Sequence, residues 1–140
     1  MRISDLTSEL AKSADLAQFP QDEKLVLITV NKTIEIPYLD LYDSVRYSWV
    51  LSPERASTAD YILAVAHDLI LDAFEAVTWL PATKANFPDI SEEHGNWSNQ
   101  KDRFGFHGKL ALDDVRRRYQ GKRLPDDHKS GQNPIRYVHY

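Results

Sequence analysis

The residues best suited to chemistry are arginines that gather toward the C-terminus among aromatic and amide side chains. Residues 101–140 hold ten Lys and Arg against five Asp and Glu, whereas residues 1–100 hold seven against sixteen. Arginine presents a planar fork of donors that matches phosphate, and aromatic rings and amides suit ribose and base recognition. The pattern indicates an anionic ligand such as a nucleotide, and it specifies no reaction.

Three consecutive arginines, Arg116, Arg117 and Arg118, lie in a predicted helix and fan across about 200° of its circumference. One interpretation is a solvated helix face whose charges complement the helix dipole. The other is an anion site or a contact between subunits. Lys122 and Arg123 extend the basic patch and favour the second interpretation.

Single residues earlier in the chain have two interpretations each. Arg46 either grips a phosphate or forms an ion pair with Asp43 or Asp60, and the sequence does not choose between these. Trp49 is three residues away, and a core position suits it better than a stacking role. Further along, Trp79 ends a strand where the long loop begins, and Trp97 lies in that loop beside Asn96. Trp97 could stack on a flat ligand or anchor the loop, and Phe87 has the same two interpretations.

No catalytic set stands out. The five histidines are scattered without a metal-ligand spacing, and phosphate-binding glycine loops and nucleophile motifs are absent. His107 with Asp113 or Asp114 could act as a base pair, but such pairs occur in many globular proteins. The sequence therefore favours a binding protein without a cofactor or metal over an enzyme, and a nucleotide hydrolase using His107 remains the outside alternative.

Hydrophobic periodicity and turn residues predict a single α+β domain over residues 1–140. It consists of an N-terminal helical region over 1–20 and an α+β core over 24–138. The segment Tyr61–Ala66 is continuously apolar and predicts a central buried strand. A bent mixed or antiparallel sheet with short helices, closing toward a barrel, suits the short strands. Strands are predicted at 24–30, 33–36, 61–66, 69–79, 103–110 and 134–138, helices at 4–16, 40–46, 53–59 and 113–119, and a long loop at 81–100.

Composition limits the remaining classes of protein. A hydrophobic content of 42% with 11% aromatic residues argues against disorder, and the absence of Cys excludes disulfides and thiolate zinc sites. No signal peptide and no apolar run of about 18 residues is visible, which favours a cytoplasmic protein outside the membrane. The net charge of −4 suits a local site for a small anion better than a non-specific surface for nucleic acid.

Spaced residues over 39–138 form a pattern that comprises Tyr42-Asp43, Val45-Arg46, Trp49, Arg55-Ala56, Ala59-Asp60-Tyr61, Leu63-Ala64-Val65, Trp79, Arg103, Phe106, Gly108, Tyr119, Gly121-Lys122 and Gln132 to Val138. This pattern resembles a small prokaryotic domain that occurs alone and attached to GIY-YIG-type nucleases. It also resembles the phage anti-Thoeris sponges, which sequester a cyclic ADP-ribose signal and assemble from several copies. The chain has no GIY or YIG tripeptide, so the resemblance implies no nuclease activity, and His67-Asp68 stands where a glycine turn is expected.

The resemblance to the sponges implies a non-catalytic, homo-oligomeric protein that binds a small nucleotide in the cytoplasm of a phage host. The alternative is an accessory module of the PUA-like kind that binds nucleic acid. The ligand-binding residues that the resemblance implies are Arg46, Trp79, Phe87, Asn96, Arg103, Arg116, Arg117 and Arg136.

Overall fold

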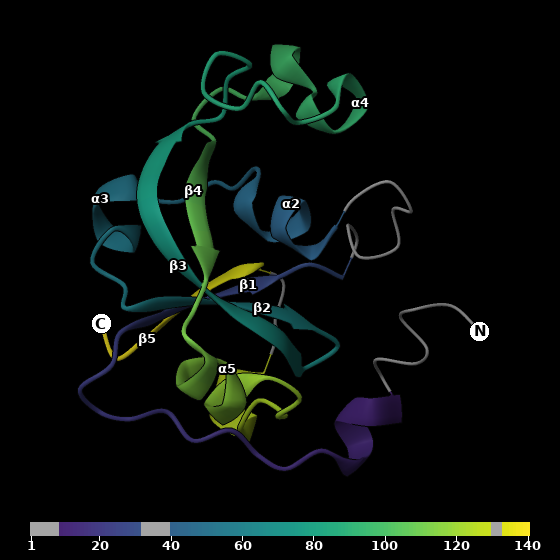
Figure 1. The fold of residues 1–140 in the computed structure, drawn as a ribbon, viewed down its shortest axis with the longest axis vertical. Coiled ribbons are helices and arrows are strands. Elements are labelled where there is room, and N and C mark those ends of the chain that lie inside the picture. Colours follow the sequence, from purple (N-terminus) through teal and green to yellow (C-terminus); the bar gives the residue numbers. More distant parts are fainter. Residues whose placement is uncertain (1–8, 32–39, 130–132) are drawn as a thin grey trace.

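The apolar segment Tyr61–Ala66 forms strand β2 at the centre of a five-stranded sheet in the computed structural model, which describes residues 9–31, 40–129 and 133–140 (Figure 1). Five of its six residues are buried. A strand that is covered on both faces needs apolar side chains on both, and this explains the unbroken run. The predicted central buried strand is confirmed.

The strands run in the order β4-β3-β2-β1-β5. Strand β1 (Leu25–Thr29) is parallel to β2 and antiparallel to β5 (Ile135–Val138), while β3 (Leu69–Pro81) is antiparallel to β2 and to β4 (Phe104–Leu110). The sheet is therefore mixed, and with its short helices it confirms the α+β class. Strands β4 and β5 end the sheet on opposite sides, so the expected closure toward a barrel does not occur.

A tight turn at His67 and Asp68 joins β2 to β3. Both residues have positive φ, 51° and 65°, which is the backbone twist that two-residue hairpins prefer. The side chain of Asn31 accepts a hydrogen bond of 2.9 Å from the backbone N–H of His67. The turn therefore forms without the glycine that the resemblance led us to expect.

Local capping explains the short helices. Asp40 caps α2 (Leu41–Arg46) by accepting from the backbone N–H of Asp43, and Ser52 caps α3 (Pro53–Ala56), which starts with proline. Helix α5 (Asp113–Tyr119) has acids in its first turn and arginines in its last. Helices α3 and α5 begin where the sequence predicts, and the turn or helix predicted from residue 40 is helix α2, which begins at Leu41. Helix α3 ends at Ala56 and not near residue 59.

Apolar side chains form a core on each face of the sheet. Helices α2 and α3 cover one face, and α5 with the segment around Ala17 covers the other (Figure 1). The core under α2 and α3 consists of Val26, Ile28, Val30, Val45, Ala56, Ile62, Ala64, Ala66, Phe74, Trp79, Phe106 and Ile135. The core under α5 consists of Ala17, Leu25, Leu27, Leu63, Val65, Ile70, Ala73, Ala111, Val115, Tyr119, Leu124 and Val138.

The long connection between β3 and β4 projects beyond the sheet at the end away from α5 (Figure 1). The sequence predicts a loop there, and the structure adds the helical turn α4 (Glu92–Gly95) and the 3-10 turn η2 (Trp97–Asn99). This 82–103 connection has a small core of its own around Tyr47 and Phe87. It is therefore a folded unit attached to the sheet.

Two predictions in the N-terminal part of the chain fall partly or wholly outside the described residues. The helix predicted at 4–16 ends at residue 13 in the part of the chain that the structure describes, and residues 4–8 lie outside that part. The strand predicted at 33–36 also lies outside it. Strand β1 has β2 on one side and β5 on the other. Among the described residues, no helix is long and apolar enough to cross a membrane.

Candidate functional site

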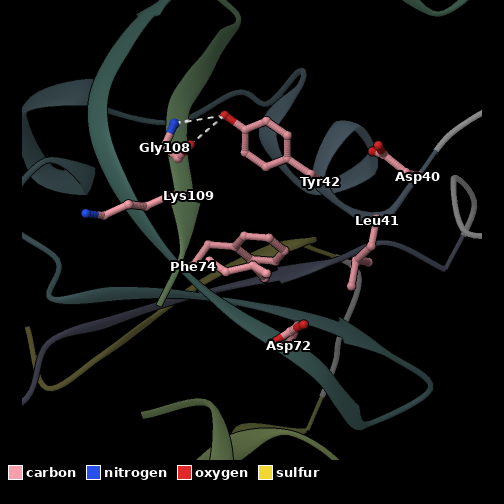
Figure 2. Close-up of a pocket in the computed structure, with 8 residues that line it drawn as sticks. Asp40, Leu41, Tyr42, Asp72, Phe74, Gly108 and Lys109 are labelled. Carbon is pink, nitrogen blue, oxygen red and sulfur yellow. Dashed lines mark hydrogen bonds between the residues drawn. The ribbon is translucent and has the colours of Figure 1, made fainter. Parts of the chain in front are cut away.

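A cleft of about 360 Å³ lies between the start of α2 and the facing parts of β3 and β4 (Figure 2). This volume falls at the lower end of the range of about 300–1,000 Å³ that small-molecule sites occupy. The sheet supplies its floor and α2 supplies one wall. The residues that line this α2–β4 cleft are Asp40, Leu41, Tyr42, Asp72, Phe74, Gly108, Lys109 and Leu110.

Apolar and aromatic side chains make up most of the lining. The rings of Tyr42 and Phe74 lie 6.0 Å apart and are tilted by 33°, a normal separation for an aromatic pair. Leu41 and Leu110 complete the apolar surface. Leu110 is 47% exposed although it is a large apolar residue, so the cleft leaves apolar surface in contact with water. A flat apolar ring would cover that surface.

A pair of hydrogen bonds between Tyr42 and Gly108 fixes the wall of the cleft (Figure 2). The Tyr42 hydroxyl accepts from the backbone N–H of Gly108 at 2.8 Å and donates to the carbonyl oxygen of the same residue at 3.1 Å. The outer edge of β4 is thereby joined to α2. Glycine is required at 108 because a Cβ there would collide with the carbonyl oxygen of Glu75 on β3.

Two carboxylates supply the polar part of the lining. Asp72 is 6% exposed, and its Oδ1 accepts from Arg116 Nε at 2.8 Å and from its neighbour Ala73 N at 2.9 Å. Its Oδ2 accepts from a second Arg116 nitrogen at 3.0 Å. Asp40 is exposed and uses Oδ1 to cap α2 at 2.8 Å. The cleft thus presents acceptor oxygens at two positions.

Two cations stand beside the cleft. The hydrogen bonds from Arg116 to Asp72 raise the pKa of that guanidinium, so it stays charged at any physiological pH. Lys109 also lines the cleft, and its ammonium group points away from Tyr42 and Phe74 (Figure 2). That ammonium group lies 3.9 Å from Glu75, and its side chain is 68% exposed.

Arg46, one of the predicted ligand-binding residues, lies inside the protein. It is 1% exposed, and it donates to Asp43 from Nε at 2.9 Å and to Asp89 from a terminal nitrogen at 2.8 Å. Burial alone would lower the pKa of Arg46, but the two carboxylates raise it. The ion pair with Asp43 is the alternative that the structure bears out, whereas Asp60 caps the backbone N–H of Lys24. Arg46 is therefore unavailable to a ligand.

The predicted stacking residues are also packed against protein. Phe87 is fully buried and stacks on His107 at 4.7 Å, and Trp79 is 8% exposed and packs on Phe106 at 5.0 Å. Neither ring offers a free face. Trp97 is half-buried against Tyr47, which leaves it the anchoring role.

The remaining predicted residues lie on separate elements. Arg103, at the start of β4, donates to the carbonyl oxygen of Ser48 at 3.2 Å, and Arg136, on the opposite edge strand, donates to the carbonyl oxygen of Lys129. Asn96 is exposed in a left-handed conformation between α4 and η2. The expected convergence of the arginines does not occur. Arg116 contacts Asp72, which lines the cleft, and the buried Arg46 lies 4.7 Å from the centre of the Tyr42 ring.

Sequence features mark some of the residues that line the cleft, although they are not among the predicted site residues. Asp72 interrupts an otherwise apolar strand segment, and a charge in such a place needs a partner on a neighbouring element. Tyr42 and Gly108 both belong to the spaced pattern that carries the resemblance. Phe74 and Leu110 carried no signal, because apolar strand residues look alike whether they face a core or a cleft.

His107 is held in place by both ring nitrogens. Nε2 lies 2.6 Å from the carbonyl oxygen of Asn86, and Nδ1 lies 3.4 Å from Arg46. Since a carbonyl oxygen only accepts and a guanidinium only donates, these two contacts suit the tautomer that carries its proton on Nε2. Asp113 and Asp114 lie on α5 and make no contact with it. The alternative of a hydrolase based on His107 therefore lacks a free base.

The described part of the chain contains no group of three or more His, Cys, Asp or Glu side chains placed to hold a metal ion. Comparisons with protein families, with curated proteins and with solved structures found no match for the chain. The resemblance to the sponge proteins therefore remains a prediction.

Proposed function

We propose that the protein binds a small nucleotide without converting it, with the base of that nucleotide in the α2–β4 cleft. The observation that supports this most is the apolar cleft itself, in which the half-buried ring of Tyr42 and the exposed Leu110 lie beside the buried ring of Phe74. A planar base could stack there, and stacking on an aromatic side chain contributes about 1–3 kcal/mol per base. Few polar side chains line the cleft, so most of its surface is available for stacking.

The phosphate of such a nucleotide would lie outside the cleft, because Asp40 and Asp72 would repel it inside. Arg116 stands beside Asp72, and Arg117 follows it on the exposed surface of α5. Each charge-assisted hydrogen bond to phosphate contributes about 1.5–3 kcal/mol. Two such bonds and one stacked base would give affinity in the micromolar range or better after ordering costs.

The resemblance to the sponges suggests the biological ligand. A cyclic ADP-ribose-type immune signal carries an adenine ring and phosphates, so sequestering it would make the protein a phage anti-defence factor acting in the host cytoplasm. Binding without turnover is supported by His107, whose ring nitrogens are both engaged. We therefore also propose that the protein releases its ligand unchanged.

Titration calorimetry of the purified protein tests the proposal. The titrants are AMP, ADP-ribose, cyclic ADP-ribose isomers and a short DNA duplex, and mass spectrometry identifies the small molecules afterwards. We expect saturable binding of at least one adenine nucleotide, recovered intact. Binding of DNA alone would support the nucleic-acid module instead, and steady product formation would show an enzyme.

A further inference from the structure

We infer that the α2–β4 cleft selects bases that present an amino group, and that it rejects bases with a carbonyl oxygen at the same ring position. This inference rests on the proposed function and concerns the same site. It follows from the polar atoms of the lining. The side chains that face the cleft offer hydrogen-bond acceptors and no free donor.

Asp72 retains one place for a ligand donor. An ionised carboxylate has about four acceptor positions on its two oxygens. Arg116 occupies two of these positions, and the backbone N–H of Ala73 occupies a third. The remaining position is on Oδ2, which accepts one hydrogen bond from Arg116. Asp72 lines the cleft, and a carboxylate oxygen only accepts, so a ligand atom facing Oδ2 would have to donate to it.

Asp40 supplies a second acceptor from the opposite wall. Its Oδ1 caps α2 through the backbone N–H of Asp43, and its Oδ2 has no hydrogen-bond partner among the described residues. Figure 2 shows Asp40 at the start of α2 and Asp72 on β3, with Leu41 between them and Phe74 to one side in this view. Because both carboxylates line the cleft, a planar base held there would have one of them near its edge.

The other polar side chains of the lining do not donate into the cleft. The single hydroxyl hydrogen of Tyr42 is directed to the carbonyl oxygen of Gly108. The ammonium group of Lys109 lies on the side of Glu75, away from the rings. Leu41, Phe74 and Leu110 have no polar side-chain atoms. A carbonyl oxygen on the ligand would thus face a carboxylate with no donor to satisfy it.

Bases differ in the exocyclic group that they would present to these carboxylates. Adenine and cytosine carry an exocyclic amino group, which donates, where hypoxanthine and uracil carry a carbonyl oxygen, which accepts. AMP and IMP are therefore a matched pair, as are CMP and UMP, because each pair keeps the sugar and the phosphate. We expect the amino member of each pair to bind at least tenfold more tightly.

The experiment is calorimetric titration of these four nucleotides into the wild-type protein, Asp72→Asn, Asp40→Asn and the control Glu93→Gln, which changes an exposed carboxylate on α4. Asparagine adds a donor without changing the shape of the side chain. We expect the preference for AMP over IMP to fall toward one in at least one Asp variant and to persist in the control. Asp40→Asn protects the test against misfolding, because asparagine caps helices as well as aspartate does.

Two outcomes would overturn the inference in distinguishable ways. Equal affinity for AMP and IMP, with binding still abolished when the cleft is filled by Leu110→Trp, would contradict the selection of amino groups and leave the proposed function intact. The same holds if the preference is unchanged in both Asp variants. Failure of all four nucleotides to bind the wild-type protein would overturn the proposed function together with the inference.

Discussion

Arginine residues of the same type have different roles in this protein because their neighbours differ. Arg46 is enclosed by Asp43, Asp89 and the ring of Tyr42, whose centre lies 4.7 Å from the guanidinium. Arg117 is exposed on α5. A sequence gives the residue type, but burial and pairing depend on which elements meet in the fold. The sequence offers Asp43 as a partner of Arg46, whereas Asp89, which is 43 positions away, becomes a second partner only through the fold.

The two carboxylates that pair with Arg46 should contribute unequally to stability. Asp43 is 26% exposed at its side chain, whereas Asp89 is 67% exposed. We expect Asp43→Asn to lower the free energy of unfolding by about 1–3 kcal/mol, because the buried guanidinium loses its shielded partner. Asp89→Asn should cost less than about 1 kcal/mol, because water screens that pair. Urea unfolding of both variants measures this, and a larger loss for Asp89→Asn would contradict the assignment.

At the scale of the element, the 82–103 connection is attached to the sheet through a half-buried histidine. His94 lies against the ring of Tyr47 at 5.4 Å, and Asp43 and Arg46 of α2 face it. Its Nε2 is buried and has no hydrogen-bond partner among the described residues. Burial lowers the pKa of His94 below its usual 6.5, so the folded protein holds this ring neutral.

This makes stability depend on pH below about 6.5. Above that value His94 is neutral in both the folded and the unfolded chain. As the pH falls below it, the unfolded chain takes up the proton first, so the free energy of unfolding decreases until the folded pKa is passed. We expect His94→Gln to show a smaller decrease than the wild-type protein between pH 6.5 and 5 in denaturant titrations. An equal decrease in both proteins would contradict this role of His94.

The elements were more predictable than the site. Strands β2 and β3 and helix α5 follow from apolar runs, turn residues and helix-dipole charges, all of which act locally. The α2–β4 cleft depends on Tyr42 meeting Gly108, residues that are 66 positions apart. No local sequence pattern predicts such a contact. The sequence therefore predicted arginines as the site, whereas the structure offers an apolar cleft with Arg116 at its side.

For the whole molecule, the opposite charges of the two ends of the chain meet within one copy. Arg118 donates to Glu23 at 3.1 Å, Lys122 lies 4.0 Å from Asp15, and the hydroxyl of Tyr119 donates to Glu23. The complementarity that suggested contacts between subunits is thus partly used inside the chain. A homo-oligomer remains a prediction, since the sponge proteins assemble from several copies.

Light scattering at micromolar concentration measures the mass of the assembly. On the basis of the resemblance we expect at least a dimer, with a mass near twice the 16.1 kDa of one chain. Arg116 and Arg118 of α5 form ion pairs within the chain, whereas Arg117 is exposed. We therefore expect Arg117→Glu to weaken the assembly more than Arg118→Gln does. A mass of one chain at all concentrations would contradict the prediction.

The central claim is that a nucleotide base occupies the α2–β4 cleft, and a matched pair of variants tests it most directly. Leu110→Trp places a large ring in the cleft, whereas Leu112→Trp places the same ring two residues away at a position that is 65% exposed and does not line the cleft. The measurement is the dissociation constant of AMP for the wild-type protein and both variants. We expect AMP to bind Leu110→Trp at least tenfold more weakly and Leu112→Trp with unchanged affinity. Equal affinity in all three proteins would contradict the claim that a base occupies the cleft.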